Sequence, residues 1–257
     1  MRLNALYGLA ALLVAASAFA AEPPAPPRYV YLHQEFVKPS AIKEYEATSR
    51  EFAALVTRNR DVMPHFNVRA MMSDDFAYTF AMPLSGMGDV DLVSAEFGAL
   101  AQKTGAAFTD LMKRNNATID HVREWVLEPL YEGSYRPEQP RLREDEVKFH
   151  HLDVYFLLPE RETEVEPLAR EFKALFAKKA IADGYTLYRT ATGPDMPALV
   201  ASVAARDAAD YYAQARANRA QLGAEGEALF ARALALARRF ETRNVWLRPD
   251  LDVPTRP

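Results

Sequence analysis

The sequence predicts an α+β fold in which a βαββαβ unit occurs twice, and three observations support this prediction. The chain resembles itself at a constant separation of 120 residues. Short segments rich in aromatic and β-branched residues, which are typical of strands, are followed by longer segments whose apolar residues lie on one helical face. These segments follow in the same order in both copies. A duplicated unit therefore describes the chain best.

The repeat is clearest where the same letters return 120 residues later. REFAAL at residues 50–55 is followed by REFKAL at residues 170–175. Chance agreement between two amphipathic segments is the alternative, but one offset kept from residue 32 to residue 249 favours duplication. The single residues that match at this offset include Leu32/Leu152, Phe36/Phe156, Pro39/Pro159, Glu44/Glu164, Glu46/Glu166, Arg69/Arg189, Arg123/Arg243, Leu127/Leu247 and Pro129/Pro249.

The first unit opens with a segment rich in aromatic and β-branched residues, which predicts a strand. Pro39 then starts a helix whose apolar residues lie on one face. A second helix of about 25 residues follows the SGMGD turn, and Gly105 is expected to break or kink it. The predicted strands of this unit span residues 29–37, 65–72, 76–84 and 122–127.

The second unit repeats this order. A helix with apolar residues on one face follows Pro159. A long Ala-rich helix is predicted over about 207–240, with an interruption near Gly223 and Gly226. The predicted strands span residues 147–158, 185–191, 198–204 and 243–247.

The N-terminus has the pattern of a cleaved secretory signal. Arg2 is the basic residue, 9–16 is a short apolar run, and Ala18-Phe19-Ala20 is an A-x-A cleavage motif. The run is shorter than a membrane span requires. We therefore expect cleavage after Ala20 and a periplasmic or secreted mature protein. The predicted parts are a signal peptide (1–20), a Pro-rich linker (21–28), the first unit (29–132), a linker (133–146) and the second unit (147–253).

Composition and motifs exclude several classes of function. The chain has no cysteine, so disulfides and thiol chemistry are excluded. A formal net charge of −4 argues against a nucleic-acid-binding surface. There is no P-loop, no G-x-G-x-x-G and no G-x-S-x-G. The histidines lack metal-ligand spacing, so we expect neither a metal nor a cofactor.

The βαββαβ order is the ferredoxin-like order. Its duplication, with about 110 residues per unit, resembles a tandem member of the dimeric α+β barrel superfamily. This superfamily includes antibiotic-biosynthesis-type monooxygenases, haem-degrading monooxygenases, NIPSNAP-like proteins and stress-responsive barrel proteins. The resemblance rests on element order and not on a catalytic motif. It implies that two tandem ferredoxin-like units form an intrachain α/β barrel with the helices outside. Haem would need an axial histidine, and no predicted helix contains one.

Strand alternation predicts which side chains enter such a barrel. We assign the face with Leu32 and Phe36 to the helix-packed core, because both residues recur in the second unit. The opposite face of each first strand would then line a shared interior. The second strands would add an arginine each. The predicted ligand-binding residues are Tyr31, His33, Glu35, Arg69, His151, Asp153, Tyr155 and Arg189.

Two interpretations of these polar residues stay open at this point. They could line a cavity for a small polar or aromatic ligand. They could instead pair with one another as a network that fills a closed interface. His33, His151 and Asp153 are the better ligand candidates, because they do not repeat. No catalytic residue can be assigned.

The sequence thus predicts a secreted or periplasmic small-molecule-binding or accessory protein, with its cavity between the two units and no assignable reaction. The resemblance implies an enzyme alternative, a cofactor-independent monooxygenase of the antibiotic-biosynthesis type. A structural or assembly protein without a ligand is the third possibility. We expect the protein to be a monomer or a homodimer that binds a small aromatic or polar ligand. We expect it to bind neither nucleic acid nor, after signal cleavage, a membrane.

Overall fold

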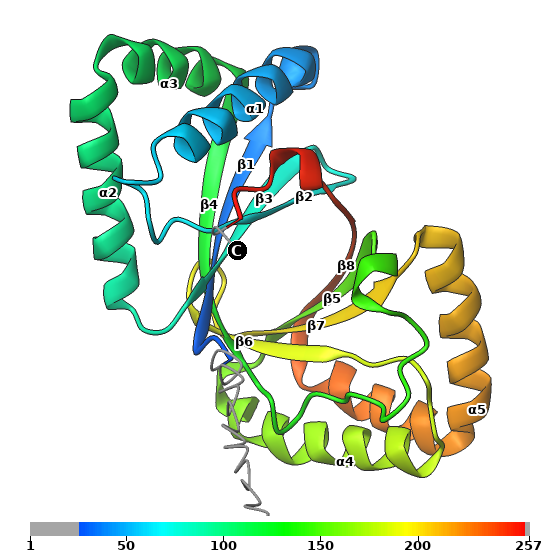
Figure 1. The fold of residues 1–257 in the computed structure, drawn as a ribbon. Coiled ribbons are helices and arrows are strands. Elements are labelled where there is room, and N and C mark those ends of the chain that lie inside the picture. The colour runs from blue at the N-terminus through cyan, green and yellow to red at the C-terminus, as the bar shows by residue number, and fades with distance from the viewer. Residues whose placement is uncertain (1–25, 255–257) are drawn as a thin grey trace, which may run out of the picture.

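Eight strands form one closed antiparallel barrel in a computed structural model of the chain, which describes residues 26–254. The strand order around the barrel is β1-β3-β2-β8-β5-β7-β6-β4. Figure 1 shows α1, α2 and α3 on one side of the strands and α4 and α5 on the other. The α+β barrel expected from the sequence is confirmed at this level. The predicted signal peptide lies outside the described residues.

The elements follow the predicted order. The strands are β1 (Tyr29–Val37), β2 (Arg69–Ser73), β3 (Ala77–Leu84), β4 (Ile119–Pro129), β5 (Phe149–Leu157), β6 (Thr186–Thr192), β7 (Ala198–Ala205) and β8 (Ala237–Leu247). The helices are α1 (Ile42–Arg58), α2 (Gly88–Thr104), α3 (Ala106–Thr118), α4 (Val165–Lys178) and α5 (Ala208–Ala235).

Each half of the chain contributes one sheet to the barrel. In the first half, β1 lies between β3 and β4, and in the second, β5 lies between β7 and β8. The two sheets meet where β2 pairs with β8 over residues 71–73, and where β4 pairs with β6 over residues 126–129. These short seams let a single chain close the barrel.

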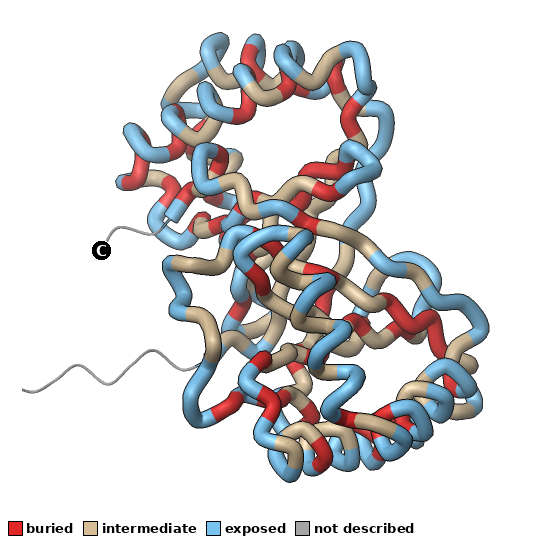
Figure 2. The backbone as a smooth tube through the Cα atoms, turned by 90° about the vertical axis from the view of Figure 1, so that its right-hand side faces the viewer, coloured by how far each residue is buried: buried red, intermediate tan, exposed pale blue. Residues whose placement is uncertain are grey.

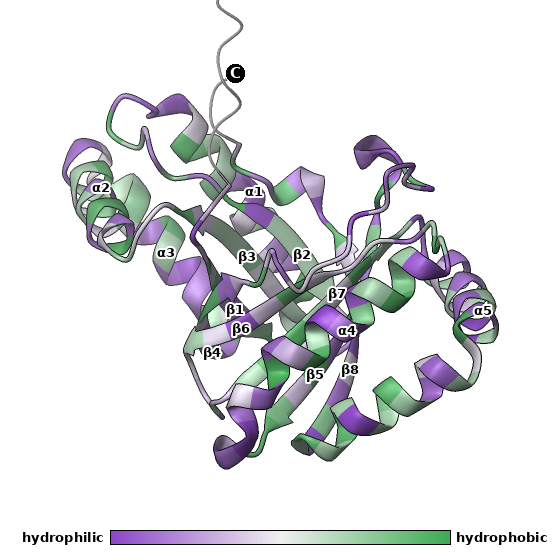
Figure 3. Ribbon diagram, turned by 90° about the horizontal axis from the view of Figure 1, so that it is seen from below, coloured by the Kyte–Doolittle hydropathy of each residue, from purple (hydrophilic) through white to green (hydrophobic). Residues whose placement is uncertain are grey.

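The helices pack on the outside of the barrel through their apolar faces. Leu55 and Val56 of α1 meet Leu100 of α2 in the first-half core, and Leu168 of α4 meets Leu229 of α5 in the second. Burying a leucine of this kind stabilises the fold by roughly 1.5–3 kcal/mol. Buried and exposed residues alternate along the helices in Figure 2, and polar and apolar ones alternate along α4 and α5 in Figure 3. Helix packing therefore accounts for both outer layers.

Two glycines bend the long helical segments, as predicted. Gly105, with φ 56°, separates α2 from α3, and Gly223, with φ 60° and ψ −151°, kinks α5. Glycine reaches these backbone angles without the penalty that a Cβ brings. The Ala-rich helix ends at Ala235, so the prediction that it extends to residue 240 is wrong. Residues 237–246 pair along β5 instead, and tertiary pairing overrides their helix propensity.

Each half ends in a segment that packs against the other half. After β4, Tyr135 enters the second-half core, where its hydroxyl donates to the carbonyl of Ile181 at 3.0 Å. After β8, Leu251 and Val253 are buried against the first half. The backbone of Val253 pairs there with Val68. The two halves are therefore connected through exchanged terminal segments as well as through the seams.

The structure reverses the predicted assignment of the strand faces. Glu35 accepts a hydrogen bond from Tyr45 of α1, so the row that contains Glu35 faces the helices. His151 stacks against Tyr211 of α5, so the matching row of β5 does so too. The other face of β5 points into the barrel, where Phe156 packs in an apolar cluster. A closed barrel has a second apolar layer inside the sheet, and this layer accounts for the recurring leucines and phenylalanines.

Candidate ligand-binding site

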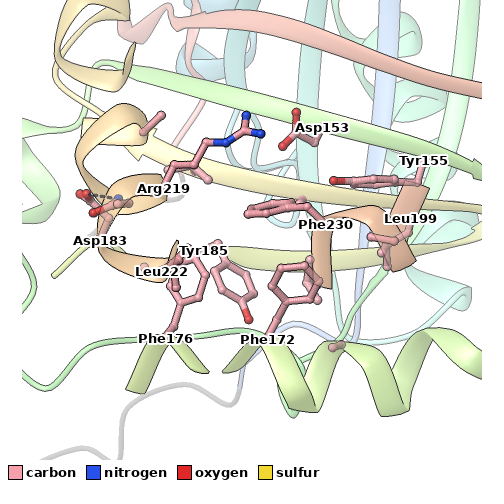
Figure 4. Close-up of a pocket in the computed structure, with 18 of the residues that line it drawn as sticks. Asp153, Tyr155, Phe172, Phe176, Asp183, Tyr185, Leu199, Arg219, Leu222 and Phe230 are labelled. Carbon is pink, nitrogen blue, oxygen red and sulfur yellow. Dashed lines mark hydrogen bonds between the residues drawn. The ribbon is translucent and has the colours of Figure 1, made fainter. Parts of the chain in front are cut away.

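A cavity of about 410 Å³ lies between the second-half sheet and helices α4 and α5 (Figure 4). Its volume falls within the range of small-molecule sites. The cavity lies within the second half, so the prediction of a cavity between the two units is wrong. The predicted barrel-facing row of β5 is covered by α4 and α5 and lines this cavity instead. Most of its walls are aromatic or aliphatic, and they include Tyr155, Leu157, Leu168, Phe172, Phe176, Leu187, Leu199, Leu222, Phe230 and Phe240.

The kink in α5 shapes this cavity. Leu222 lines it from the arm before Gly223, and Phe230 lines it from the arm after Gly223. Arg219 and Glu227 connect the two arms through hydrogen bonds of 2.5 and 2.8 Å. The bent helix thus forms two walls of the cavity, whereas a straight helix would form one.

A paired charge cluster forms one edge of the cavity. Arg141, from the predicted linker, donates to Asp183 at 2.7 Å and to Asp210 of α5 at 2.8 Å. Asn218 donates to the second oxygen of Asp183 at 2.8 Å. Charges that leave water are stable only when they are paired in this way. The segment predicted as a linker consequently holds the N-terminal part of α5 against the loop after α4.

Asp153 is the carboxylate at the sheet wall of the cavity, and His151 holds it in place. The Nε2 atom of His151 lies 3.3 Å from Asp153 Oδ1, and Nδ1 lies 3.0 Å from Asn244 Oδ1. The His151 ring also stacks on Tyr211, with centroids 4.1 Å apart. Burial lowers the pKa of His151, but the hydrogen bonds to Asp153 and Asn244 outweigh it and raise the pKa overall. The imidazolium form therefore fits this environment.

Three phenols line the cavity in their neutral form. Burial raises the pKa of Tyr155, Tyr185 and Tyr211 well above its usual range. The charge of Asp153 raises the pKa of Tyr155 and Tyr211 further. A neutral phenol donates one hydrogen bond. These residues can therefore hold a ligand oxygen but cannot serve as bases near neutral pH.

The structure brings three of the predicted site residues together at this cavity. Asp153 and Tyr155 line it, and His151 lies directly behind Asp153. All three come from the helix-facing side of β5, where they alternate with barrel-facing residues. Their proximity follows from strand alternation, although the face they occupy is the opposite of the predicted one.

The three candidates from β1 form a separate cluster on the first half. His33 lies 3.2 Å from Glu35 and 3.3 Å from Glu124 of β4. Tyr31 donates to the same Glu124 at 2.6 Å. This cluster faces the first-half helices, whereas the cavity faces α4 and α5. The expected meeting of both sets in one interior is therefore wrong.

The two repeat-matched arginines also lie apart. Arg69 pairs in the sheet with Ala81, which faces the barrel, and it donates to Glu144 at 3.1 Å. Arg189 pairs with Leu199, a residue of the cavity wall, and donates to Glu128 at 2.8 Å. Residues of β1 and β5 that are 120 positions apart occupy equivalent places in the two halves. Arg69 of β2 and Arg189 of β6 are also 120 positions apart, but their partners Ala81 and Leu199 are not. The two side chains consequently belong to opposite faces.

Sequence reasoning missed most of the cavity wall. Phe172 and Phe176 belong to the apolar face of the helix predicted after Pro159, but such a face predicts ordinary core packing just as well. Tyr185 was recognised only as part of a strand. A concentration of aromatic residues on α4 was the one available signal, and it does not distinguish a filled core from a cavity.

The residues at this site do not fit a haem or a metal ion. The histidines lie on strands or in the segment before β2, and none of them lines the cavity. An axially bound haem in this cavity would lack the histidine that usually holds its iron. Between residues 26 and 254, no group of three or more metal-ligating side chains is placed to hold a metal.

No protein-family model matches the sequence, and a search of curated proteins found no significant match. No helix within the described residues is both long and apolar enough to cross a membrane.

Solved structures, in contrast, share the whole fold. A proposed monooxygenase from Lactobacillus acidophilus superposes with a TM-score of 0.52 at 9% identity, covering 90% of this chain and 97% of its own. An anthrone oxidase-like protein gives 0.57 at 10% identity, covering 86% and 91%. Chlorite dismutase from Candidatus Nitrospira defluvii, as its R173K mutant, gives 0.52 at 14% identity, covering 87% and 92%.

These neighbours are members of the dimeric α+β barrel superfamily, and the chain has that fold. The resemblance expected from the sequence is therefore confirmed for the architecture. At identities this low, the similarity shows the fold and leaves the activity open.

Proposed function

We propose that this protein binds a small, flat, largely apolar molecule in the cavity between the second-half sheet and helices α4 and α5. The observation that carries the proposal is the cavity itself, about 410 Å³ in volume, with aromatic walls and a few polar groups. Sites for small aromatic ligands have this composition, because apolar walls supply binding energy and isolated polar groups fix orientation.

A cavity-filling substitution tests the binding role. Ala215 of α5 lines the cavity, whereas Ala217, two residues further along the same helix, is exposed. With 2-naphthol as the probe, we expect calorimetry to show at least tenfold weaker binding for Ala215→Phe and unchanged binding for Ala217→Phe. No binding to the natural sequence, or equal binding to both variants, would contradict the proposal and favour a structural or assembly role.

A second candidate is a cofactor-independent monooxygenase, and the carboxylate of Asp153 beside His151 favours it. Asp153 would accept a proton from an activated methylene of an electron-rich aromatic ligand. The resulting carbanion would supply the electrons that reduce O₂. One oxygen atom would enter the product as a carbonyl and the other would leave as water, so that CH₂ and O₂ become C=O and H₂O. The substrate supplies every electron, which is why no cofactor is needed.

Oxygen uptake with anthrone as the substrate tests this second candidate. A general base contributes typically 10²–10⁴-fold, so Asp153→Asn should lower turnover by at least about 100-fold. His151→Gln should lower it less, because His151 only positions Asp153. His33→Gln is the matched control, since His33 lies on the first half. Equal turnover of the Asp153 and His33 variants would eliminate Asp153 as the base.

We also propose that residues 1–20 are a secretory signal and that the mature protein is periplasmic or secreted. The A-x-A motif before residue 21 supports this. Mass spectrometry of the protein purified from the source cell should give a mature N-terminus at Ala21. The same measurement under native conditions should distinguish a monomer from a homodimer.

We further propose that the two halves descend from one ferredoxin-like βαββαβ unit. In both halves the first strand pairs with the third and the fourth, which supports a common origin. Sequences of single-unit relatives that match both halves would test it.

A further inference from the structure

We propose that Tyr185 recognises a carbonyl oxygen of the ligand, so that the cavity selects neutral aromatic ketones or quinones over aromatic hydrocarbons. This inference rests on the proposed binding function of the same cavity. The ligand would carry a carbonyl group, and the Tyr185 hydroxyl would donate a hydrogen bond to it.

The Tyr185 ring is held in a fixed place. Its backbone exchanges two hydrogen bonds with Tyr135, of 2.9 and 3.0 Å. Its ring packs edge-on against Phe176, with centroids 5.0 Å apart. Figure 4 shows the Tyr185 hydroxyl directed toward the space between Phe172 and Phe176. The Tyr185 side chain is therefore held on a rigid support at the cavity wall.

The hydroxyl of Tyr185 has no hydrogen-bond partner among the described residues, although it is buried. The neighbouring Tyr135 differs, because its hydroxyl donates to the Ile181 carbonyl. Buried polar groups in native proteins are nearly always paired, and an exception needs an explanation. Because the Tyr185 side chain lines the cavity, a ligand atom that reaches this hydroxyl is one such explanation.

The chemistry of the cavity decides what kind of atom this is. Burial raises the pKa of Tyr185, so its hydroxyl stays protonated and donates to an acceptor. A negatively charged acceptor would enter a cavity that already contains the carboxylate of Asp153. The cations at the rim are engaged, since Arg219 bonds Glu227 and Arg141 bonds two aspartates. A neutral oxygen acceptor meets both conditions, and on a flat aromatic molecule a ring carbonyl provides one without adding a donor that would need its own partner.

Two flat molecules of nearly the same shape, which differ only in a carbonyl group, measure the contribution of this hydrogen bond to binding. Fluorenone carries a carbonyl where fluorene carries a methylene. A single hydrogen bond in a buried site corresponds to about a tenfold difference in affinity. We expect calorimetry to show that the natural sequence binds fluorenone about ten times more tightly than fluorene. Tyr185→Phe should bind both molecules equally, at the affinity that the natural sequence has for fluorene.

Tyr188→Phe is the matched control. Tyr188 lies three residues further along the chain, in β6, but it packs in the barrel interior and not in the cavity. This variant should keep the tenfold preference for fluorenone, and thermal unfolding should show that both variants are folded.

The possible results separate the two proposals. If both molecules bind with equal affinity to the natural sequence, or if Tyr185→Phe keeps the preference, Tyr185 is not the recognition residue and the binding function stands. If neither molecule binds to the folded protein, this inference and the proposed function both fail.

Discussion

His150 and His151 are neighbours in the chain, yet they lie on opposite sides of the barrel wall. His150 faces the interior, with Nδ1 3.0 Å from the Ser202 hydroxyl, and His151 stacks on Tyr211 beneath α5. Burial, with a smaller contribution from Arg69, lowers the pKa of His150 to about 4. For His151, the hydrogen bonds to Asp153 and Asn244 outweigh burial and raise the pKa. One strand thus presents a histidine with a lowered pKa inward and a histidine with a raised pKa outward.

The interior histidine should make the fold less stable in acid. Its pKa of about 4 in the folded state lies below the ordinary value of 6.5, so the unfolded chain takes up the proton first. As the pH falls from 6.5 to 4, the free energy of unfolding of the natural sequence should therefore fall by up to about 3 kcal/mol more than that of His150→Gln. Urea unfolding of both proteins at pH 7.5 and 4.5 measures this. Parallel losses in the two proteins would show that His150 does not contribute.

His151→Gln should have the opposite pH dependence. Because folding raises the pKa of His151, the stabilisation it provides is complete below the ordinary value of 6.5 and is lost as the pH rises through the folded value. The free energy of unfolding of His151→Gln, measured with urea, should thus lie further below that of the natural sequence at pH 5.5 than at pH 8.5. A loss of stability that grows toward alkaline pH would contradict a raised pKa of His151 in the folded state.

Arg141→Ala should destabilise the protein by about 2–3 kcal/mol, because it leaves Asp183 and Asp210 without their shared cation. The Arg141 side chain is 18% exposed, and that of Arg143 is 74% exposed. Arg143→Ala is therefore the matched control, and it should leave the denaturation midpoint unchanged. Equal effects of the two variants would mean that the charge cluster at the cavity edge contributes no stability.

Gly223→Ala should strain the kink in α5. The φ of 60° and ψ of −151° are nearly confined to glycine, so a Cβ should cost about 1–3 kcal/mol. Gly98, inside α2, has open space around it, and Gly98→Ala should be neutral or stabilising by up to about 1 kcal/mol. Chemical denaturation compares the two. If Gly223→Ala is as stable as Gly98→Ala, the kink does not depend on glycine.

Tyr185→Phe should not lower the stability of the ligand-free protein, because the hydroxyl it removes has no partner among the described residues. Tyr135→Phe removes a hydroxyl that donates to Ile181, and it should cost about 1 kcal/mol. Thermal and urea unfolding of the two variants provide the comparison. A clear loss for Tyr185→Phe would indicate that another group, such as a bound water molecule, uses this hydroxyl.

The order of elements could be predicted from the sequence because it depends on local patterns. Residues 29–37 are rich in aromatic and β-branched residues, as a strand should be. Gly105 and Gly223 interrupt helices at backbone angles that glycine adopts more easily than other residues. The end of α5 could not be predicted in this way. Residues 237–242 include alanine, arginine and glutamate, which favour helices, and they form a strand because they pair with β5.

The site could be predicted only in part, for a geometric reason. Alternation correctly groups His151, Asp153 and Tyr155 on one face, but it does not say whether that face meets helices or the barrel interior. Both layers of a closed barrel are apolar, so Leu152 and Phe156 suit either one. The cavity also depends on how far α5 bends away from the sheet, which no local pattern in the sequence encodes.

The exchanged terminal segments have a consequence for the integrity of the molecule. Because Tyr135 is buried in the second half and Val253 in the first, a backbone cut between residues 136 and 146 would leave each fragment anchored in its counterpart. Such fragments should co-purify and unfold in one transition. The covalent connection between the halves would then serve mainly to bring them together during synthesis, while non-covalent packing keeps the barrel closed afterwards.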